Sequence, residues 1–315
     1  MTSRRLIRIK VLQLLYAFSK KESATIAEIE REILQSMNKS TDLYYETLSL
    51  LTEIRRKAFL KIDTARNRRF ASNKDLNPNT RFIENPVFDI IEKNKKFQNY
   101  INNNMISWSD SQETVLYFYN KMLEWPKYQK YMNKPSVTFD EHKQLVLDIF
   151  AELIIQDDIF FQMLEEKSIY WNDDFELVLS IVYKTLWHIR ENMTEEDELL
   201  FPVYKPQEDA EFARALARKT FLEFDKNIQL IDQHTKNWEL DRISEMDKLI
   251  MGCAVSELKN FPSIPIKVTL DEYIEISKTY SSPKSGAFIN GVLDKIVKQL
   301  KETNEIVKTG RGLVE

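Results

Sequence analysis

The distribution of glycine and proline most constrains how this 315-residue chain can fold. All five glycines lie at or beyond Gly252, and the prolines before position 202 are only Pro78, Pro86, Pro126 and Pro135. Glycine and proline are the residues that most often interrupt helices. Long segments that lack both, and that are rich in Leu, Ile, Glu and Lys, therefore predict helices along most of the chain.

Apolar side chains recur at the spacing of a helical face. They are separated by three or four residues in the segments 213–231, 249–258 and 289–300. This spacing places them on one side of an α-helix. No segment alternates apolar and polar residues between two turn signals, as a half-buried strand does. The sequence thus predicts an all-α fold.

Three breaks interrupt the predicted helices, near residues 72–79, 133–136 and 202–206, where Asn, Ser and Pro gather. Such clusters are typical of loops. They predict an N-terminal helical unit at residues 1–71, a middle helical unit at 82–200, and a C-terminal helical bundle at 207–304.

Charge and cysteine content limit the classes of function. A net charge of −4 excludes a globally basic nucleic-acid binder, so any RNA binding needs a local patch. The single cysteine, Cys253, excludes an internal disulfide and fits a reducing compartment. No run approaches the ~20 apolar residues that cross a bilayer, and the N-terminal segment lacks a signal-peptide cleavage pattern. We therefore expect a cytoplasmic protein with no membrane partner.

The sequence carries no motif of a catalytic or cofactor site. His142, His188 and His234 are far apart, and no His/Cys spacing suits zinc. Neither glycine-rich phosphate-binding pattern is present. We expect no enzyme activity, no catalytic residue, no metal and no cofactor.

A basic cluster opens the chain, and it consists of Arg4, Arg5, Arg8 and Lys10, with no acidic residue before Glu22. Cations at the N-terminus of a helix meet the positive end of its macrodipole, which costs roughly a few tenths of a kcal/mol per charge. Arg8 lies one turn beyond Arg4, so both can face one line of phosphates. The alternative is a basic start that only aids solubility.

A second basic run, at residues 55–69, holds seven cations against the single acid Asp63. One interpretation is a solvated helical face. The other is an extension of an RNA-binding track.

Near the C-terminus, residues 281–283 (Ser-Ser-Pro) predict a helix start. The free backbone N–H groups of the first turn, with Lys284 beside them, form a candidate phosphate site. Phe288 lies roughly 100° away from the apolar stripe of this helix, where it can stack on a base or pack on the preceding loop. Gly291, costly inside a helix, predicts a close approach by another helix.

Two motifs resemble the NusB family of bacterial transcription antitermination factors. One is R-R-L-I-R at residues 4–8 followed by L-Q-L-L-Y-A at 12–17; the other is F-I-N-G-V-L-D-K-I at 288–296, after I-P-I-K-V at 264–268. The resemblance covers roughly residues 4–20 and 208–300. It implies a NusB-like helical bundle, with the middle of the chain as an additional helical insertion.

The third helix of the family pattern has two candidates, residues 42–69 and residues 208–236. Only the second directly precedes the helix at about 246–258, as the family's order requires. We therefore assign the third helix to 208–236.

The resemblance implies sites and partners as well as a fold. Its RNA-binding residues map onto Arg4, Arg5, Arg8, Lys10, Tyr16, Lys284 and Phe288. Tyr16 has the alternative of a core position. Asp247 matches a position that contacts a protein partner, whereas Gly252 and Ser256 depart from the arginine and tyrosine common in the family. The implied partners are single-stranded, boxA-like leader RNA, the ribosomal protein NusE and the RNA polymerase elongation complex.

Two rival functions differ in what they bind. A helical adaptor would dock proteins without binding RNA. The accessory domain of ribosomal RNA cytosine methyltransferases is related, but those enzymes need a glycine-rich cofactor fold, for which we expect no room before Glu315.

Overall fold

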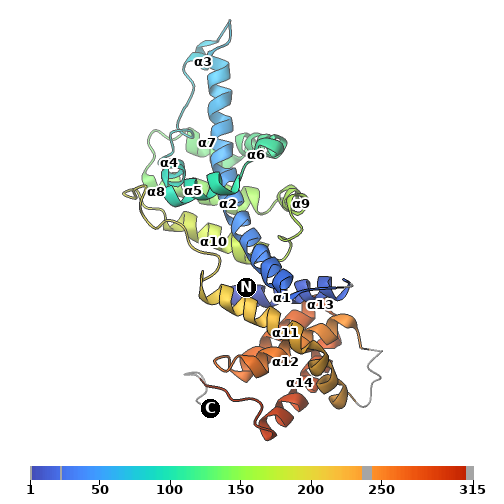
Figure 1. The fold of residues 1–315 in the computed structure, drawn as a ribbon. Helices are drawn as coiled ribbons and strands as arrows, with labels where there is room; N and C mark the ends of the chain where they lie inside the picture. The colour runs from blue at the N-terminus through green and yellow to red at the C-terminus, as the bar shows by residue number, and fades with distance from the viewer. Residues whose placement is uncertain (1, 22, 236–242, 310–315) are drawn as a thin grey trace. The chain divides into compact units, whose positions relative to one another are not determined.

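The computed structural model describes residues 2–21, 23–235 and 243–309. Every regular element in these ranges is helical and none is a strand, which confirms the predicted all-α fold (Figure 1). No described helix combines the length and the apolar character needed to cross a bilayer. The chain forms two compact units, one of residues 1–37 and 204–315 and one of residues 38–203.

The first unit is a bundle of helices from both ends of the chain. They are α1 (Ser3–Ser19), the first part of α2 (Ile26–Arg66), α11 (Glu208–His234), α12 (Glu245–Asn260), α13 (Ile266–Tyr280) and α14 (Ser285–Glu302). The helix α12 is central, because α1, α11, α13 and α14 all pack against it.

The central position of α12 follows from its sequence. Every residue from Leu249 to Leu258 is buried, so this helix is covered on all sides. Its small side chains let neighbouring helices approach closely. A Cβ atom on Gly252 would lie 2.9 Å from Cε2 of Phe224 in α11. Gly252 is thus required by packing.

The second unit is built around the remainder of α2. Its other elements are α3 (Asn73–Leu76), α4 (Pro86–Lys93), α5 (Lys95–Asn104), η1 (Ser109–Ser111), α6 (Gln112–Glu124), α7 (Pro126–Met132), α8 (Phe139–Asp148), the π-helical segment η2 (Ile149–Ile154), α9 (Asp158–Lys167) and α10 (Phe175–His188). Buried polar bonds join α2 to this shell. Trp108 Nε1 donates to the Glu46 carbonyl oxygen at 3.1 Å, and the hydroxyls of Tyr44 and Thr185 lie 2.7 Å apart.

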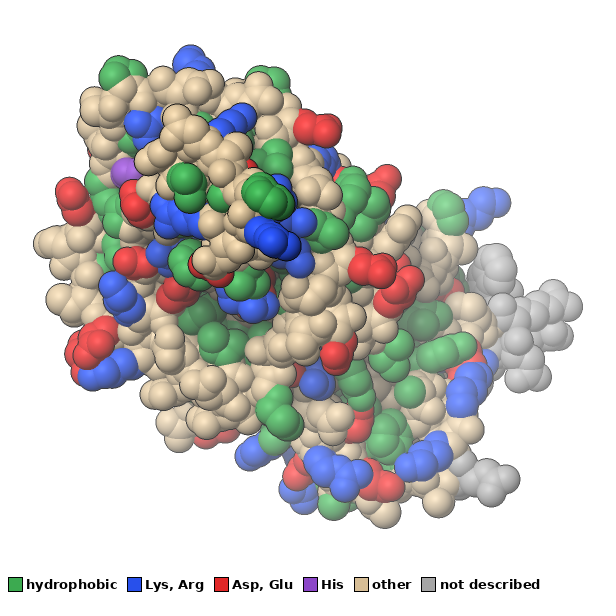
Figure 2. Space-filling view, turned by 90° about the horizontal axis from the view of Figure 1, so that it is seen from above, with side chains coloured by type: hydrophobic (Ala, Val, Ile, Leu, Met, Phe, Trp, Pro, Cys, Tyr) green, Lys and Arg blue, Asp and Glu red, His purple; other side chains and the backbone are tan. Residues whose placement is uncertain are grey.

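The last two turns of α2 differ from the rest of this helix. Ala58 is buried, but no residue from Phe59 to Phe70 is. In Figure 1 this part of α2 extends beyond α4–α8. Figure 2, which looks onto the same end, shows Lys and Arg side chains beside hydrophobic ones.

The predicted breaks have distinct structural counterparts. The break at 133–136 lies between α7 and α8, and that at 202–206 lies between α10 and α11. The break at 72–79 contains the four-residue α3. The segment 1–71 is divided, since α1 and the start of α2 belong to the first unit and the rest of α2 to the second.

The structure also tests the assignment of the third helix and the interpretation of Gly291. The helix assigned to residues 208–236 is α11, which packs on α1 and α12 in the first unit; its predicted last residue, Lys236, lies outside the described residues. The interpretation of Gly291 was wrong. Among the described residues, a Cβ atom there would meet nothing within 4 Å, so none of the described helices approaches it closely.

The surroundings of Gly252 and Gly291 therefore predict opposite responses to the same substitution. Gly252→Ala should lower the free energy of unfolding by about 1–3 kcal/mol, because the new methyl group overpacks against Phe224. Gly291→Ala should raise it by up to ~1 kcal/mol, because alanine is the better helix former and the space is open. Urea denaturation measures both changes. A shift of the same sign in the two variants would contradict this account.

Candidate nucleic-acid interface

The arginines that open α1 are held by carboxylates from distant helices. Arg4 Nε lies 2.7 Å from Asp209 Oδ1, and its Nη2 lies 2.8 Å from Glu208 Oε1. Arg5 Nε lies 2.6 Å from Glu272 Oε2, and this hydrogen bond raises the pKa of Arg5. These acids offset the unfavourable placement of cations at a helix N-terminus. Both side chains remain about one-third exposed.

Arg8 lies inside the bundle. Its side chain is 3% exposed and makes two 2.8 Å hydrogen bonds to the fully buried Glu257. Glu257 also accepts hydrogen bonds from the hydroxyls of Thr269, at 2.9 Å, and Tyr273, at 3.3 Å. Burial disfavours the charged form of Arg8, but its bonds to Glu257 outweigh this and raise its pKa. Burial also raises the pKa of Tyr273.

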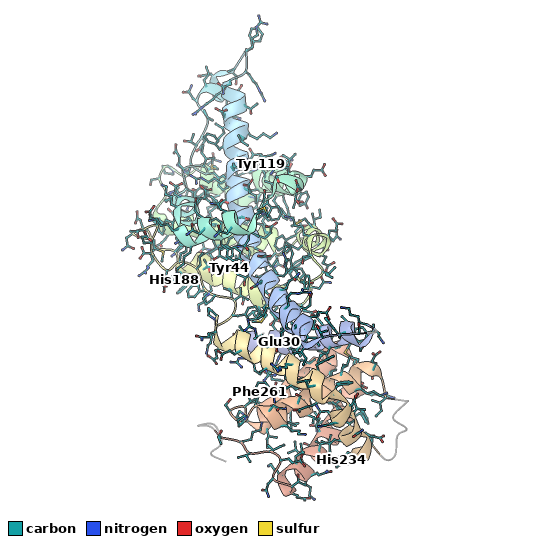
Figure 3. The ribbon with its side chains drawn as sticks, in the orientation of Figure 1. Glu30, Tyr44, Tyr119, His188, His234 and Phe261 are labelled. Atoms are coloured by element: carbon teal, nitrogen blue, oxygen red, sulfur yellow. The ribbon has the colours of Figure 1, made fainter. Side chains whose placement is uncertain are left out.

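The basic cluster therefore does not form one surface. The sequence predicts that Arg8 and Lys10 face RNA, whereas only 3% and 2% of their surfaces are accessible. All seven residues from Leu6 to Leu12 are buried, so α1 is an interior helix in this part. Phe261, labelled in Figure 3, lies in the first unit. Its ring packs edge to face on that of Phe212 with the ring centres 5.2 Å apart, and the Arg4 guanidinium lies 4.3 Å from the centre of the Phe212 ring.

The C-terminal end of α1 carries Tyr16, which is 40% exposed. The Lys20 ammonium lies 5.3 Å from the centre of its ring. Ser19 Oγ donates to the Tyr16 carbonyl oxygen at 2.7 Å and to Glu245 Oε1 at 2.8 Å. Glu245 also pairs with Lys20. These contacts fix the Tyr16 end of α1 to the start of α12.

The connection between α13 and α14 is held by Asp247, whose carboxylate is buried. Ser281 donates to Oδ1, and Ser285 donates to Oδ2 at 3.0 Å. The backbone N–H of Asp247 is itself capped by Ser244 at 3.1 Å. Asp247 thus positions the turn that leads into α14. The resemblance implies that Asp247 contacts a protein partner, whereas in the structure its carboxylate is buried in the bundle.

Lys284 and Phe288 lie at the start of α14. This helix begins at Ser285, slightly later than the Ser281–Pro283 start that the sequence predicts. Lys284 is the exposed cap residue, and no side chain caps the helix. Phe288 is half-buried. An uncapped first turn beside an exposed lysine is an arrangement that can hold a phosphate.

Contacts along α1 and α13 show how these groups are spaced. Arg5 contacts Glu272, and Gln13 donates to Tyr280 at 3.4 Å, so the two helices run in the same direction. From Arg5 to Tyr16 the helix rises about 16 Å. The structure therefore brings Tyr16 and the Ser281–Phe288 turn to one end of the helix pair and leaves Arg4 and Arg5 at the other.

Sequence reasoning missed the acidic partners of the arginines. Glu257 is more than 240 residues from Arg8 in the chain, so spacing does not connect them. One signal was present, because Glu257 is the only charged residue among the ten of the apolar run from Leu249 to Leu258. A lone charge in such a run requires a buried partner of opposite sign.

Known proteins resemble this chain over part of its length. A model of the NusB family matches residues 147–298. A transcription antitermination protein NusB of Salinibacter ruber is 36% identical over 138 residues, which are 42% of this chain and 86% of the relative. Another, from Chloroherpeton thalassium, is 43% identical over 94 residues, or 29% of this chain and 44% of the relative. A solved structure of T. maritima NusB shares 32% identity and covers 41% of this chain and 82% of its own, with a TM-score of 0.29.

The buried ion pair predicts a large effect on stability. Arg8→Met should lower the free energy of unfolding by about 3–5 kcal/mol, because Glu257 is left buried without its cation. Adding Glu257→Gln should recover part of this loss, since the uncompensated charge disappears. Urea denaturation measures both variants.

The control for this prediction is Arg218→Met, which removes an exposed pair with Glu30 and should cost only ~0–1 kcal/mol. Equal effects of Arg8→Met and Arg218→Met would show that the buried pair has no special role.

Proposed function

The chain belongs to the NusB family, and from this we propose that it is a non-catalytic transcription antitermination factor. In this proposal it binds a boxA-like element of single-stranded leader RNA in the cytoplasm, together with the ribosomal protein NusE. The assembly then joins the RNA polymerase elongation complex during ribosomal RNA synthesis. The observation that carries the proposal is the 36% identity across 86% of a relative that is itself a transcription antitermination protein.

The proposed RNA surface uses exposed and partly exposed side chains of the first unit. They are Arg4, Arg5, Tyr16, Lys284 and Phe288. The first turn of α14 and Lys284 would bind one phosphate, because the free N–H groups and the ammonium all favour an anion. The rings of Phe288 and Tyr16 would stack on bases. Arg4 and Arg5 would bind phosphates further along the strand, since both side chains are partly open to solvent.

Arg8 and Lys10 have a different role in this proposal. Their side chains are buried, so a phosphate does not reach them without unpacking α1. Arg8 instead fixes α1 to α12 and α13 through Glu257 and its hydroxyl partners. In this proposal the two residues stabilise the packing of α1 and do not contact RNA.

Asp247 acts on the partner surface indirectly in this proposal. Its carboxylate oxygens are engaged by Ser281 and Ser285, so it sets the position of the turn that carries Lys284. We propose that NusE contacts the exposed residues around this turn, and that Asp247 holds them in place.

The rival function is a helical adaptor that docks proteins without RNA. The pairing of Arg4 and Arg5 with carboxylates favours it, because RNA must compete with those acids for the cations. The deciding experiment titrates the full chain into labelled leader RNA, with and without NusE, against a scrambled RNA. Preference for the boxA-like RNA, strengthened by NusE, supports the antitermination factor. Binding of NusE without any RNA affinity identifies the adaptor.

Arg4 and Arg5 predict a change in the salt dependence of RNA binding. For single strands the logarithm of affinity falls with the logarithm of salt concentration by about 0.7 per phosphate neutralised. Arg4→Ala/Arg5→Ala should therefore reduce the slope by about 1.4. The matched control is Lys295→Ala/Lys298→Ala, two exposed lysines of α14 outside the proposed surface. Equal slopes for the two double variants would remove the arginines from the interface.

Substitution of Phe288 distinguishes stacking on an RNA base from packing in the protein core. Phe288→Ala should weaken RNA binding by ~1–3 kcal/mol, because a stacked base loses its ring. Phe288→Trp should retain binding, since it keeps an aromatic face. The loss of folding free energy should stay below the ~3–5 kcal/mol typical of a fully buried phenylalanine, because Phe288 is half-buried. Strong destabilisation in urea with unchanged affinity of the folded protein would assign Phe288 to the core instead.

A further inference from the structure

The end of α2 in the second unit is a helix segment that buries no side chain in the core. Its last two turns, from Phe59 to Arg66, contain no buried residue, and neither do residues 67–70 that follow. Helices in proteins are held mainly by packing of an apolar face. This segment nevertheless exposes 53% of Phe59, 42% of Leu60 and 87% of Phe70. Its sequence is therefore not explained by the core of the unit.

This segment and the start of α3 carry cations that form no ion pair with a described residue, although Arg68 and Lys74 lie near enough to Asp75 to lower its pKa beyond the effect of its hydrogen bonds to Ser72. Five exposed side chains form no ion pair within the described part of the chain, and they are Lys61, Arg66, Arg68, Arg69 and Lys74. The two nearby carboxylates have other roles. Asp63 accepts a hydrogen bond from Asn67 at 3.2 Å, and Asp75 caps α3 by accepting from Ser72. A basic end on a chain of net charge −4 favours an anionic ligand.

The cations further back along α2 are different. Arg55 pairs with Asp89 at 2.6 Å and with Glu92 at 2.9 Å, and Arg56 pairs with Glu53 at 2.5 Å. Complementing the helix C-terminus accounts for Arg66 in the last turn. It does not account for the cations at 68, 69 and 74, which lie beyond the end of α2.

Two rings, Phe59 and Phe70, stand on either side of the cations of this helix end. Arg66 follows Phe59 by seven residues, which places the two about 20° apart around the helix and roughly 10 Å apart along it. The Arg69 guanidinium lies 5.6 Å from the centre of the Phe70 ring. Ten ångström corresponds to about three steps of a stacked nucleic-acid strand at ~3.4 Å each. The spacing thus suits a strand that presents a base and a phosphate in turn.

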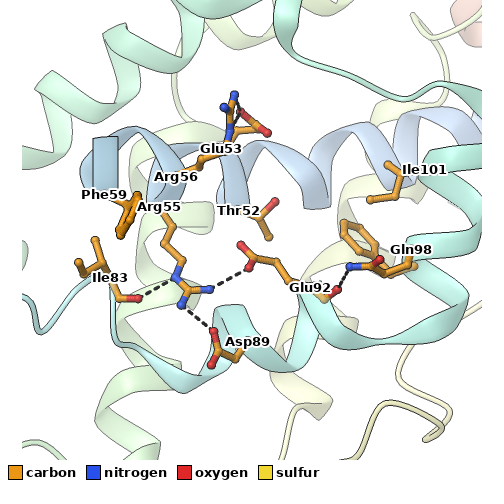
Figure 4. A pocket seen from close by; sticks show the side chains of 11 residues that line it. Thr52, Glu53, Arg55, Arg56, Phe59, Ile83, Asp89, Glu92, Gln98 and Ile101 are labelled. Carbon is orange, nitrogen blue, oxygen red and sulfur yellow. Dashed lines mark hydrogen bonds and ion pairs between the residues drawn. The ribbon is translucent and has the colours of Figure 1, made fainter. Parts of the chain in front are cut away.

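A cavity beside Phe59 offers hydrogen-bond acceptors to a base. It has a volume of about 460 Å³, and its lining includes Phe59 and Ile83, the carboxylates of Glu53, Asp89 and Glu92, and the guanidinium groups of Arg55 and Arg56 (Figure 4). Arg55 pairs with Asp89 and Glu92, and Arg56 pairs with Glu53, so these carboxylates are largely neutralised. Carboxylate oxygens such as these can accept hydrogen bonds from the amino groups of bases. A membrane-binding helix would gather its apolar side chains on one face, whereas here Arg66 shares the face of Phe59.

We propose that this end, residues 59–70, is a second binding surface for single-stranded RNA. Lys61, Arg66, Arg68 and Arg69 bind phosphates, and Phe59 and Phe70 stack on bases, with the base on Phe59 facing the cavity. The proposal rests on the second unit alone and does not require the surface around α1 and α14.

The test titrates the full chain into a labelled single-stranded RNA of about 12 nucleotides, within the range of site sizes for such proteins. Arg68→Gln/Arg69→Gln should reduce the slope of log affinity against log salt by about 1.4. The matched control, Lys130→Gln/Arg190→Gln, removes two exposed cations elsewhere in the second unit and should leave the slope unchanged. Equal slopes for the two double variants would overturn the proposal.

The rings are tested with Phe59→Ala/Phe70→Ala, which should weaken RNA binding about tenfold or more. Its control, Tyr183→Ala/Trp187→Ala, removes two exposed rings of α10 and should have no such effect. All four positions are exposed, so the variants should fold. Unchanged RNA affinity of Phe59→Ala/Phe70→Ala would overturn the proposal. So would a result in which this variant still binds RNA but no longer binds phosphatidylserine vesicles that the unaltered chain binds.

A comparison of Phe59→Ala/Phe70→Ala with Phe288→Ala distinguishes the two proposed RNA surfaces. A loss of affinity only with Phe59→Ala/Phe70→Ala supports the second surface and contradicts the one at α14. A loss only with Phe288→Ala has the reverse meaning.

Discussion

The buried ion pair between Arg8 and Glu257 is the constraint on which the first unit depends. A charge placed in a protein interior is tolerated only when it is paired and its remaining hydrogen-bonding sites are used. Here Glu257 meets that condition with Arg8, Thr269 and Tyr273, which come from α1 and α13. One carboxylate therefore fixes the position of three helices along one another. A shift of α1 or α12 by one turn would leave a buried charge without its partner, and a shift of α13 would remove the two hydroxyl hydrogen bonds to Glu257.

This constraint extends to the proposed RNA surface. Because α1 and α12 run in opposite directions, setting Arg8 against Glu257 brings Ser19 to Glu245 at the other end of the pair. The start of α12 then holds the turn before α14 through Asp247. The exposed Lys284 and the half-buried Phe288 are thus placed by a series of contacts that begins in the core. The Arg8–Glu257 pair therefore contributes both to the packing of the bundle and to the position of these surface residues.

The sequence predicts the helices better than the roles of individual residues. Helix formation depends on local features of the sequence, namely the absence of glycine and proline and the spacing of apolar side chains by three or four residues. The burial of Arg8 depends on an acid far away in the chain. The sequence therefore predicts that the three arginines form one surface, whereas two of them are partly exposed and one is buried. The glycines show the same limit. Gly252 and Gly291 both lie in helices, and only the neighbouring Phe224 makes the first one necessary.

The two proposed RNA surfaces meet the same electrostatic requirement in different ways. At the start of α14 the backbone itself attracts an anion, because the free N–H groups carry the positive end of the helix dipole. One lysine, Lys284, is then a sufficient addition. At the end of α2 the exposed carbonyl groups carry the negative end, which repels a phosphate. Cations there must first offset the dipole before they bind an anion, so a site at a helix C-terminus needs several of them. The clustering of Arg66, Arg68 and Arg69 satisfies that need within four residues.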